Sequence, residues 1–236
     1  MRNALGVIQE AHDDFKRIFG RGGDSPFLDE YMTEDADFVV IGQGTAAVAG
    51  MSVAAAIAEA LPRARLPVVA LPATELSGFS LVDDMSDTLV IAISQSGTTT
   101  DTNRTVDLLR ARGAWVVSIV NRRNSDLTHK SDGVLFTSDG RDVEMSVAST
   151  KAFYAQVAAG VLLAFGLAEA TGQTDTERQH ELLGALRDLP NAMERLLAAR
   201  PLIRDLATEH APARRHWAVV GNGSNRIAAA EIRIKL

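Results

Sequence analysis

The segment at positions 94–99, Ser-Gln-Ser-Gly-Thr-Thr, brings together in one loop three kinds of group that bind phosphate. Hydroxyl groups are supplied by Ser94, Ser96, Thr98 and Thr99. Backbone N–H groups come from the loop itself, in which Gly97 allows a tight turn and a close approach to a ligand. A helical pattern begins directly afterwards, and the N-terminus of a helix carries a partial positive charge. The segment contains no lysine or arginine, so neutral donors would hold the anion.

A helix N-cap is the simpler interpretation of this segment, because serine and threonine are common at that position. A cap needs only one such residue, whereas five of the eight residues from 94 to 101 are serine or threonine. We therefore favour the phosphate-binding interpretation.

Two other polar segments could take part in a site. Gly-Gln-Gly-Thr at 42–45 follows an apolar stretch, but Ala46 and Ala47 stand near where a dinucleotide-binding turn has its third glycine. No acidic residue ends the second apolar stretch, where a dinucleotide ribose would need one. Thr45 is therefore expected to contact a sugar or a phosphate. The segment at 144–153 predicts a helix capped by Ser149 and Thr150, and its spacing alone does not place it near a ligand.

Apolar strands alternate with helices along most of the chain. Strands are expected at 38–41, 67–71, 88–93, 115–120 and 134–136. Helices are expected at 2–20, 46–60, 101–112, 149–167 and 177–199. The alternation predicts an α/β fold in which a doubly wound, five-stranded parallel sheet has helices on both faces. Ligands of such sheets bind beyond the carboxyl ends of the strands, so the loops after Ile41, Ile93 and Val120 are the expected site.

A strand, a Gly-x-Gly turn and an Ala-rich helix occur in that order twice, at 38–60 and again at 217–236. In the second copy a strand is expected at 217–220 and a helix at 227–236. We expect this copy to be the start of a second similar domain. The expected organisation is an N-terminal helical segment at 1–36, one domain at 37–200, and a linker with a truncated second domain at 201–236.

The composition argues against several classes of function. The 236 residues carry a formal net charge of −6, which disfavours nucleic-acid binding. The chain has no cysteine, which excludes disulfides, thiol catalysis and cysteine-based zinc sites, as well as a glutaminase that uses an N-terminal cysteine. We expect no metal site, no cofactor, no membrane span and a cytoplasmic location.

These segments together resemble the sugar-isomerase (SIS) domain in the isomerase half of the glutamine–fructose-6-phosphate aminotransferases. That family carries a Ser-Gln-Ser-Gly-x-Thr-x-Asp-Thr loop, which is matched at 94–102. It also carries Val-Ala-Ser-Thr-Lys-Ala-Phe, which is matched without change at 147–153. Its Gly-x-Gly-Thr-Ser turn is matched at 42–45, although Ala46 replaces the serine. The resemblance spans residues 37–170 and resumes near residue 216.

The resemblance implies a flavodoxin-like sheet and the binding of a hexose phosphate, such as fructose 6-phosphate or glucosamine 6-phosphate. By position, it implies that the phosphate is held by Ser94, Gln95, Ser96 and Thr99. It implies that the other substrate-binding residues are Thr45, Val147, Ala148 and Ser149. Domains of this kind usually dimerise, so a homodimer or a higher oligomer is expected.

Aldose–ketose isomerisation needs a base beside the carbonyl carbon and an acid that returns the proton. The resemblance places the family's base at the position of Leu236, which cannot move a proton, and the family's glutaminase domain is absent from the chain. The candidates left are Glu144, which more simply anchors the loop before Val147, and two histidines. His129 is expected in a surface turn and His216 at a sheet edge.

Three interpretations therefore stay open. The first is a phosphosugar-binding domain of a glucosamine-6-phosphate-synthase-like protein, and the second is a working isomerase whose base comes from a neighbouring subunit. The third is a non-catalytic sugar-phosphate sensor or assembly domain.

Overall fold

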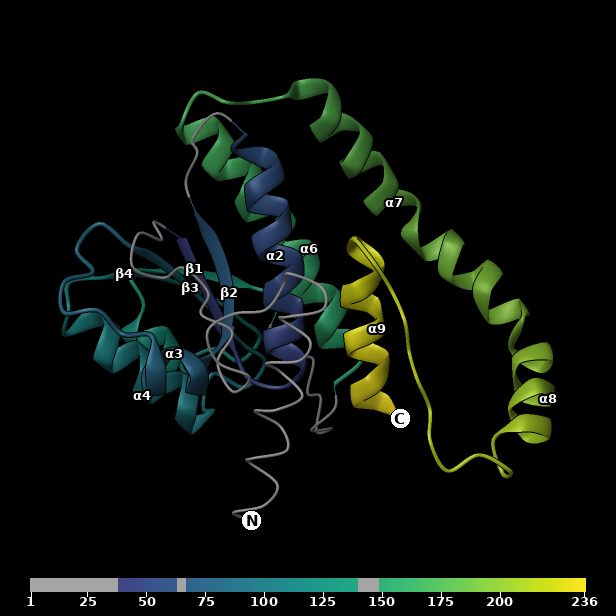
Figure 1. Cartoon of the computed structure of the whole chain (residues 1–236). Helices are drawn as coiled ribbons and strands as arrows, with labels where there is room; N and C mark the ends of the chain where they lie inside the picture. Colours follow the sequence, from purple (N-terminus) through teal and green to yellow (C-terminus); the bar gives the residue numbers. More distant parts are fainter. Residues whose placement is uncertain (1–37, 63–66, 140–148) are drawn as a thin grey trace, which may run out of the picture. The chain divides into compact units, whose positions relative to one another are not determined.

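A five-stranded parallel sheet forms the centre of the protein in the computed structural model, which describes residues 38–62, 67–139 and 149–236 (Figure 1). The strands are β1 (Phe38–Gly42), β2 (Val68–Pro72), β3 (Leu89–Ser94), β4 (Trp115–Val120) and β5 (Gly133–Phe136). They lie in the order β2-β1-β3-β4-β5, and every neighbouring pair is parallel. This is the flavodoxin-like order, so the predicted fold class is confirmed.

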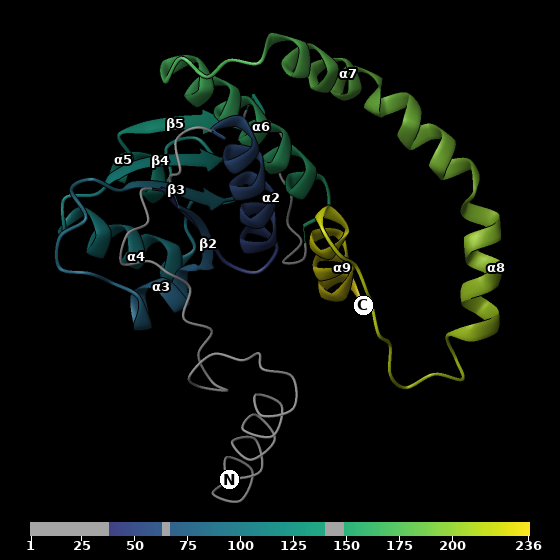
Figure 2. The same ribbon diagram turned by 45° about the horizontal axis from the view of Figure 1, so that its top comes forward.

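Helices cover both faces of the sheet, as predicted (Figure 2). On one face Val39 and Ile41 of β1 pack with residues of α3 (Ala73–Phe79), α4 (Thr100–Arg110) and α5 (Asp126–Lys130). On the other face Phe38 and Val40 pack with residues of α2 (Thr45–Ala60) and α6 (Lys151–Ala170). Successive residues of β1 therefore face opposite sides, and both sides are buried, as the continuous apolar run in the strand requires.

Helix α6 packs closely against α2 at Gly160. A Cβ atom added there would be 2.2 Å from Cγ2 of Val53, so a larger residue would not fit. By length and apolar composition alone, α6 could also cross a membrane. In the structure one of its faces, which includes Ala159 and Ala164, is buried in the core between α2 and the sheet.

After α6 the chain continues in three helices, α7 (Thr176–Ala198), α8 (Arg200–His210) and α9 (Ser224–Lys235). The prediction of a helix at 177–199 is confirmed, whereas α8 was not anticipated. Its proline, Pro201, lies in the first turn of the helix, where a missing N–H costs no hydrogen bond. The predicted helix at 2–20 lies outside the described residues.

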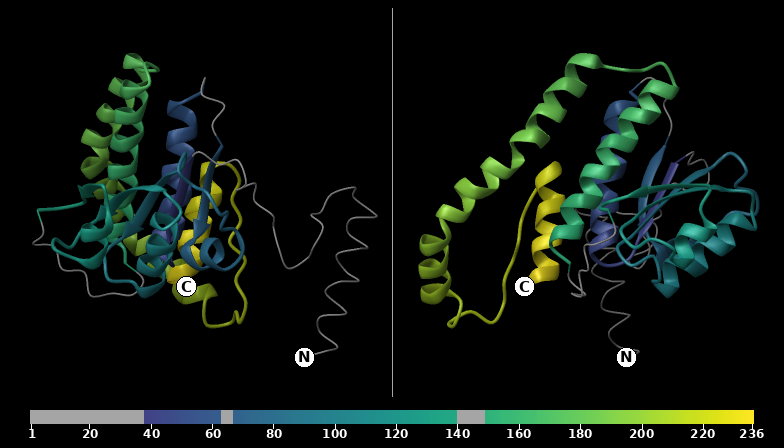
Figure 3. Two further views of the ribbon diagram at one scale, coloured as in Figure 1. Left: turned by 90° about the vertical axis from the view of Figure 1, so that its left-hand side faces the viewer. Right: turned by 180° about the vertical axis from the view of Figure 1, so that it is seen from behind.

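The strand predicted at 217–220 is wrong: these residues have no regular secondary structure and are exposed. A strand forms only when a neighbour satisfies its backbone groups, and no described residue pairs with this segment. The helix that follows does form, as α9, and it lies beside α2 (Figure 3). Its Ile227, Ala230 and Ile234 pack against a small cluster of Val48, Ala49 and Phe153.

The two Gly-x-Gly turns of the sequence have the same backbone conformation. Gly44 precedes α2 with φ 58° and ψ −127°, and Gly223 precedes α9 with φ 55° and ψ −136°. A Cβ atom at Gly42 would lie 2.7 Å from the carbonyl oxygen of Ala46, and one at Gly221 would lie 2.3 Å from that of Asn225. The turn and the helix of the internal repeat are therefore also present in the local structure, whereas the strand of the second copy is not.

Candidate functional site

The loops at 42–45 and 94–99 lie next to each other, at the point where the strand order of the sheet reverses. β1 and β3 are direct neighbours, with Ile41 paired to Ala92, so the segments 42–45 and 94–99 leave the same edge of the sheet. In a sheet of this order the crevice between β1 and β3 is where ligands bind. The helices that follow, α2 and α4, start here, and neither has a side-chain cap at its N-terminus.

The hydroxyl groups of the 94–99 loop bond within the loop. Ser94 Oγ accepts a hydrogen bond from the N–H of Gly97 at 3.0 Å and lies 3.4 Å from Thr99 Oγ1. Ser96 Oγ accepts from both the N–H and the hydroxyl of Thr98, at 3.2 and 3.0 Å. None of these bonds caps α4, whose N-cap residue is Thr99. The simple N-cap interpretation therefore does not account for the hydroxyl groups.

Gly97 has a conformation and surroundings that few other residues could share. Its φ is 65°, in the left-handed region, and an added Cβ would lie 2.0 Å from Ser125 Oγ and 3.0 Å from Cγ2 of Val120. Its carbonyl oxygen accepts from the N–H of Leu127 at 3.0 Å and from Asn103 Nδ2 at 3.1 Å. Residues at the start of α5 and in the first turn of α4 thus hold the loop in place.

A second polar cluster lies beside the first residue of α2. Glu231 of α9 is 7% exposed, and its Oε1 accepts a hydrogen bond from Thr45 Oγ1 at 3.2 Å. The Nζ of Lys235 lies 2.8 Å from the same oxygen and 3.4 Å from Thr45 Oγ1, and it also donates to the carbonyl of Ser149. The other oxygen of Glu231, Oε2, is buried and has no hydrogen-bond partner among the described residues.

This cluster unites two residues that the sequence analysis selected, Thr45 and Ser149, with two that it missed. Glu231 and Lys235 are not among the residues predicted from the sequence, because the resemblance points to position 236, where Leu236 is 76% exposed. The available signal was the i,i+4 spacing of a glutamate and a lysine on the helix after the second Gly-x-Gly turn. Among the other acid–base candidates, His129 and His216 are exposed. Glu144, Val147 and Ala148 lie outside the described residues.

A cavity of about 750 Å³ adjoins the 94–99 loop. Its polar side consists of residues that follow β3, β4 and β5, together with the start of α6: Gln95, Asn121, Thr137, Thr150 and Lys151. Its apolar side comes from α6 and α7 and includes Tyr154, Leu189 and Met193. Of the predicted phosphate ligands, Gln95 is the one that lines this space. Its backbone carbonyl accepts from the N–H groups of Asn121 and Arg122, both at 3.2 Å.

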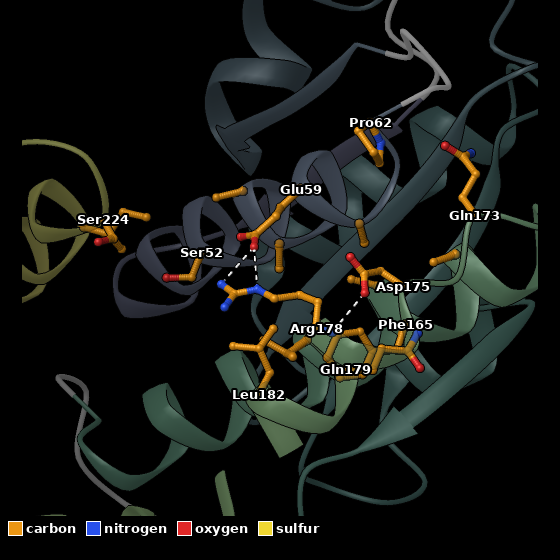
Figure 4. A pocket seen from close by; sticks show the side chains of 17 residues that line it. Ser52, Glu59, Pro62, Phe165, Gln173, Asp175, Arg178, Gln179, Leu182 and Ser224 are labelled. Atoms are coloured by element: carbon orange, nitrogen blue, oxygen red, sulfur yellow. Dashed lines mark hydrogen bonds and ion pairs between the residues drawn. The ribbon is translucent and has the colours of Figure 1, made fainter. Parts of the chain in front are cut away.

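Another cavity, of about 440 Å³, lies between α2, α6 and α7 (Figure 4). Most of its wall is apolar and includes Ala56, Ala164 and Phe165. At its edge Arg178 forms ion pairs of 2.9 Å with Glu59 and 2.6 Å with Glu181. Both pairs are exposed to solvent; the pair with Glu59 connects α2 and α7, and the pair with Glu181 lies within α7. No cluster of metal-binding side chains occurs in the described segments.

Both the sequence and the fold have relatives among known proteins. The sequence matches the SIS domain family over residues 32–165. A glutamine–fructose-6-phosphate aminotransferase (isomerizing) of Corynebacterium glutamicum is 36% identical over 190 residues, which are 79% of this chain and 29% of that protein. The protein of the same name from Thermus thermophilus is 38% identical over 175 residues, which are 74% of this chain and 28% of the relative. The chain therefore spans only part of the length of these relatives.

Solved structures share the fold. The C-terminal domain of glucosamine-fructose-6-phosphate aminotransferase from Francisella tularensis gives a TM-score of 0.75 at 25% identity, over 86% of this chain and 56% of that one. Glucosamine-6-phosphate deaminase from Thermotoga maritima gives a TM-score of 0.51 at 22% identity, over 76% of this chain and 51% of that one. Because the deaminase is only 22% identical, its similarity to this chain shows a shared fold and nothing more.

Proposed function

The chain belongs to the SIS domain family, and we propose that it binds a hexose phosphate, such as fructose 6-phosphate or glucosamine 6-phosphate, with the phosphate on the 94–99 loop. The relatives named for fructose 6-phosphate support this substrate class. The loop offers the hydroxyls of Ser94, Ser96 and Thr99 beside the uncapped N-terminus of α4. Hydrogen bonds to a charged phosphate would replace the weaker neutral bonds that these hydroxyls now make to one another. In this proposal the side chain of Gln95 provides a further donor.

The sugar would extend from the phosphate towards Thr45 and Glu231. The observation that carries this part of the proposal is the 3.2 Å hydrogen bond between these residues, which holds a buried carboxylate at the neighbouring strand end. One oxygen of that carboxylate is occupied by Thr45 and Lys235, while Oε2 is free to accept a proton. Val147, Ala148 and Ser149 remain proposed contacts of the sugar.

We propose isomerisation as the reaction. Glu231 Oε2 takes the proton from the carbon beside the sugar carbonyl, which leaves an enediolate, and returns it to the former carbonyl carbon. The hydroxyl proton of the first carbon passes to the former carbonyl oxygen, so that a ketose becomes an aldose or the reverse. Lys235 orients the carboxylate through their 2.8 Å contact. We favour Glu231 because it is buried and is held by Thr45, which follows β1, whereas Glu144 lies outside the described residues.

We also propose that residues 37–200 form one SIS domain and that 201–236 contain a linker and the start of a second. The matching turns at Gly44 and Gly223 support this division, as does the greater length of the relatives. A homodimer or a higher oligomer in the cytoplasm is the proposed working form.

A sugar-phosphate sensor or assembly domain without catalysis is the second candidate. It is favoured by the apolar side chains that α7 and α8 expose, including Leu197 at 65% and Leu202 at 63%, since no described residue of either helix is buried. Ligand-controlled association would cover such side chains.

Binding and turnover measured on the same preparation separate the two candidates. Calorimetric titration with fructose 6-phosphate tests binding, and the appearance of glucose 6-phosphate tests isomerisation. Binding with turnover supports the isomerase. Binding without turnover, accompanied by a ligand-dependent change of molecular mass, supports the sensor, and the absence of binding contradicts both.

A further inference from the structure

Asn103, in the first turns of α4, turns its side chain back into the 94–99 loop. The residue is 6% exposed, and its Nδ2 donates to the carbonyl oxygens of Gly97 at 3.1 Å and Thr99 at 3.0 Å. Both partners are acceptors, so they fix which end of the amide faces the loop. The other end, Oδ1, is buried without a hydrogen-bond partner among the described residues. The buried, unpaired Oδ1 destabilises the fold, whereas the amide nitrogen of the same side chain binds two carbonyls of the loop.

The direction of these two carbonyls determines where two N–H groups point. In a trans peptide the C=O and the following N–H are antiparallel, and no cis peptide occurs in the described segments. The carbonyls of Gly97 and Thr99 point towards Asn103, so the N–H groups of Thr98 and Thr100 point away from it, out of the loop. The N–H of Thr98 now donates to Ser96 Oγ at 3.2 Å, in an exposed bond that an anion could replace.

We propose that Asn103 is a positioning residue of the phosphate site: its amide keeps the carbonyls of Gly97 and Thr99 turned inward so that the N–H groups of Thr98 and Thr100 meet the phosphate. The proposal rests on the proposed function of the loop. Its physical basis is that donors bind an anion well only if they are aligned beforehand, and that a carbonyl turned outward would repel the same anion. Asn103 itself would not touch the ligand.

The two carbonyls keep other partners when the amide is removed. Gly97 O still accepts from the N–H of Leu127 at 3.0 Å, and Thr99 O from the backbone N–H of Asn103 at 3.0 Å. Asn103→Leu, which has a similar volume, is therefore expected to fold with a loop that is less well ordered.

Thr105 supplies a matched control on the same helix. It is fully buried, and the single hydroxyl proton on its Oγ1 lies within hydrogen-bond distance of two carbonyl oxygens, those of Ala73 at 2.9 Å and Asp101 at 2.8 Å, neither of which belongs to the loop. Thr105→Val thus also removes side-chain hydrogen bonding from α4 to backbone carbonyls, although one hydroxyl proton is shared between the two acceptors here. A purely structural role for Asn103 predicts the same behaviour for the two variants.

The experiment measures the thermal midpoint without ligand and the affinity for inorganic phosphate and fructose 6-phosphate, for the wild type and both variants. We expect similar losses of thermal midpoint. Asn103→Leu should lose about tenfold in affinity for both ligands, by a similar factor, whereas Thr105→Val should stay within about twofold. Equal affinity of Asn103→Leu and the wild type, or equal losses in both variants, would overturn the inference. Failure of the wild type to bind either ligand would instead overturn the proposed function.

A second measurement needs no variant. In the ¹⁵N–¹H spectrum of the wild type, inorganic phosphate should shift the backbone amides of Thr98 and Thr100 more than that of Leu127, whose N–H points to Gly97 O. If phosphate binds and leaves the amides of Thr98 and Thr100 unmoved, the positioning role is contradicted even where Asn103→Leu does not fold.

Discussion

Thr45 and Glu231 are 186 positions apart in the sequence, yet Thr45 Oγ1 donates a 3.2 Å hydrogen bond to Glu231 Oε1. Thr45 begins the helix that follows β1, and Glu231 belongs to α9, which packs on that helix. The bond therefore couples the docking of α9 to the position of a buried carboxylate at the crevice between β1 and β3. In the proposed reaction this carboxylate is the base.

Glu231→Gln is expected to abolish isomerisation and to retain binding. Glutamine has a similar shape and can still bond to Thr45, but it cannot take a proton at neutral pH. The rate of conversion of fructose 6-phosphate should fall by at least about a hundredfold, while the dissociation constant should change by no more than a few-fold. Glu59→Gln, at an exposed carboxylate that pairs with Arg178, is the control and should keep full activity. An active Glu231→Gln variant would exclude Glu231 as the base.

Ser96→Ala is expected to weaken the binding of fructose 6-phosphate and glucosamine 6-phosphate about tenfold. The variant removes a hydroxyl that is already oriented by Thr98 and that would donate to the charged phosphate. Calorimetric titration measures the effect, with Arg122→Ala as the control because that side chain is exposed. The same affinity in the wild type and Ser96→Ala would mean that the hydroxyl only stabilises the loop.

The sequence was sufficient to predict the five strands of the sheet, their parallel pairing and the position of the 94–99 loop, because these follow from local patterns and from their order along the chain. Five apolar runs alternate with helices, and the hydroxyl-rich loop lies directly after one of them. The sequence did not identify Glu231 as a site residue, because its place in the site depends on a contact with Thr45, 186 positions away. A glutamate four positions before a lysine also fits an ordinary exposed helix face.

Two predictions about the fold differ from the structure because the local sequence does not determine the structure of these segments. The segment 217–220 has the composition of a strand, but strand formation depends on a partner, and none is present among the described residues. The helix predicted at 177–199 is followed by α8, whose Pro201 lies in the first turn, where a proline is compatible with a helix. In both cases the local residues permit two structures.

Gly97→Ala is expected to destabilise the fold and to impair phosphate binding. The added Cβ would lie 2.0 Å from Ser125 Oγ, and the backbone has φ 65°, which costs a residue with a Cβ about 1 kcal/mol or more. Urea unfolding should show a loss of about 2 kcal/mol or more once the steric contact is included. Gly97→Val should be worse, because a β-branched residue tolerates positive φ poorly.

Gly78→Ala provides the comparison for this prediction. Gly78 lies in α3, and a Cβ at this position would meet no heavy atom within 4 Å. Alanine there should leave the stability unchanged or raise it slightly, because it reduces the entropy of the unfolded chain. Equal effects at positions 78 and 97 would show that the conformation of Gly97 is not required.

Asp132 should make the stability of the sheet edge depend on pH in the acid range. The backbone N–H of Val116 donates to its Oδ2 at 2.8 Å, and this hydrogen bond, with a smaller contribution from Arg110, lowers the pKa of Asp132 below its ordinary value of 3.8. A carboxyl group whose pKa is lower in the folded state stabilises that state when it is ionised. The contribution is therefore fully present above pH 3.8 and is lost as the pH falls through the lowered pKa.

We accordingly expect Asp132→Ala to reduce the free energy of unfolding by about 1 kcal/mol at pH 7, since the group is only partly shielded from solvent. The difference from the wild type should shrink as the pH is lowered below 3.8. Urea unfolding at several values between pH 7 and pH 3 measures this, with the exposed Asp83→Ala as the control. A difference that stays constant or grows towards acid pH would show that the bond from Val116 to Asp132 does not stabilise the ionised carboxylate.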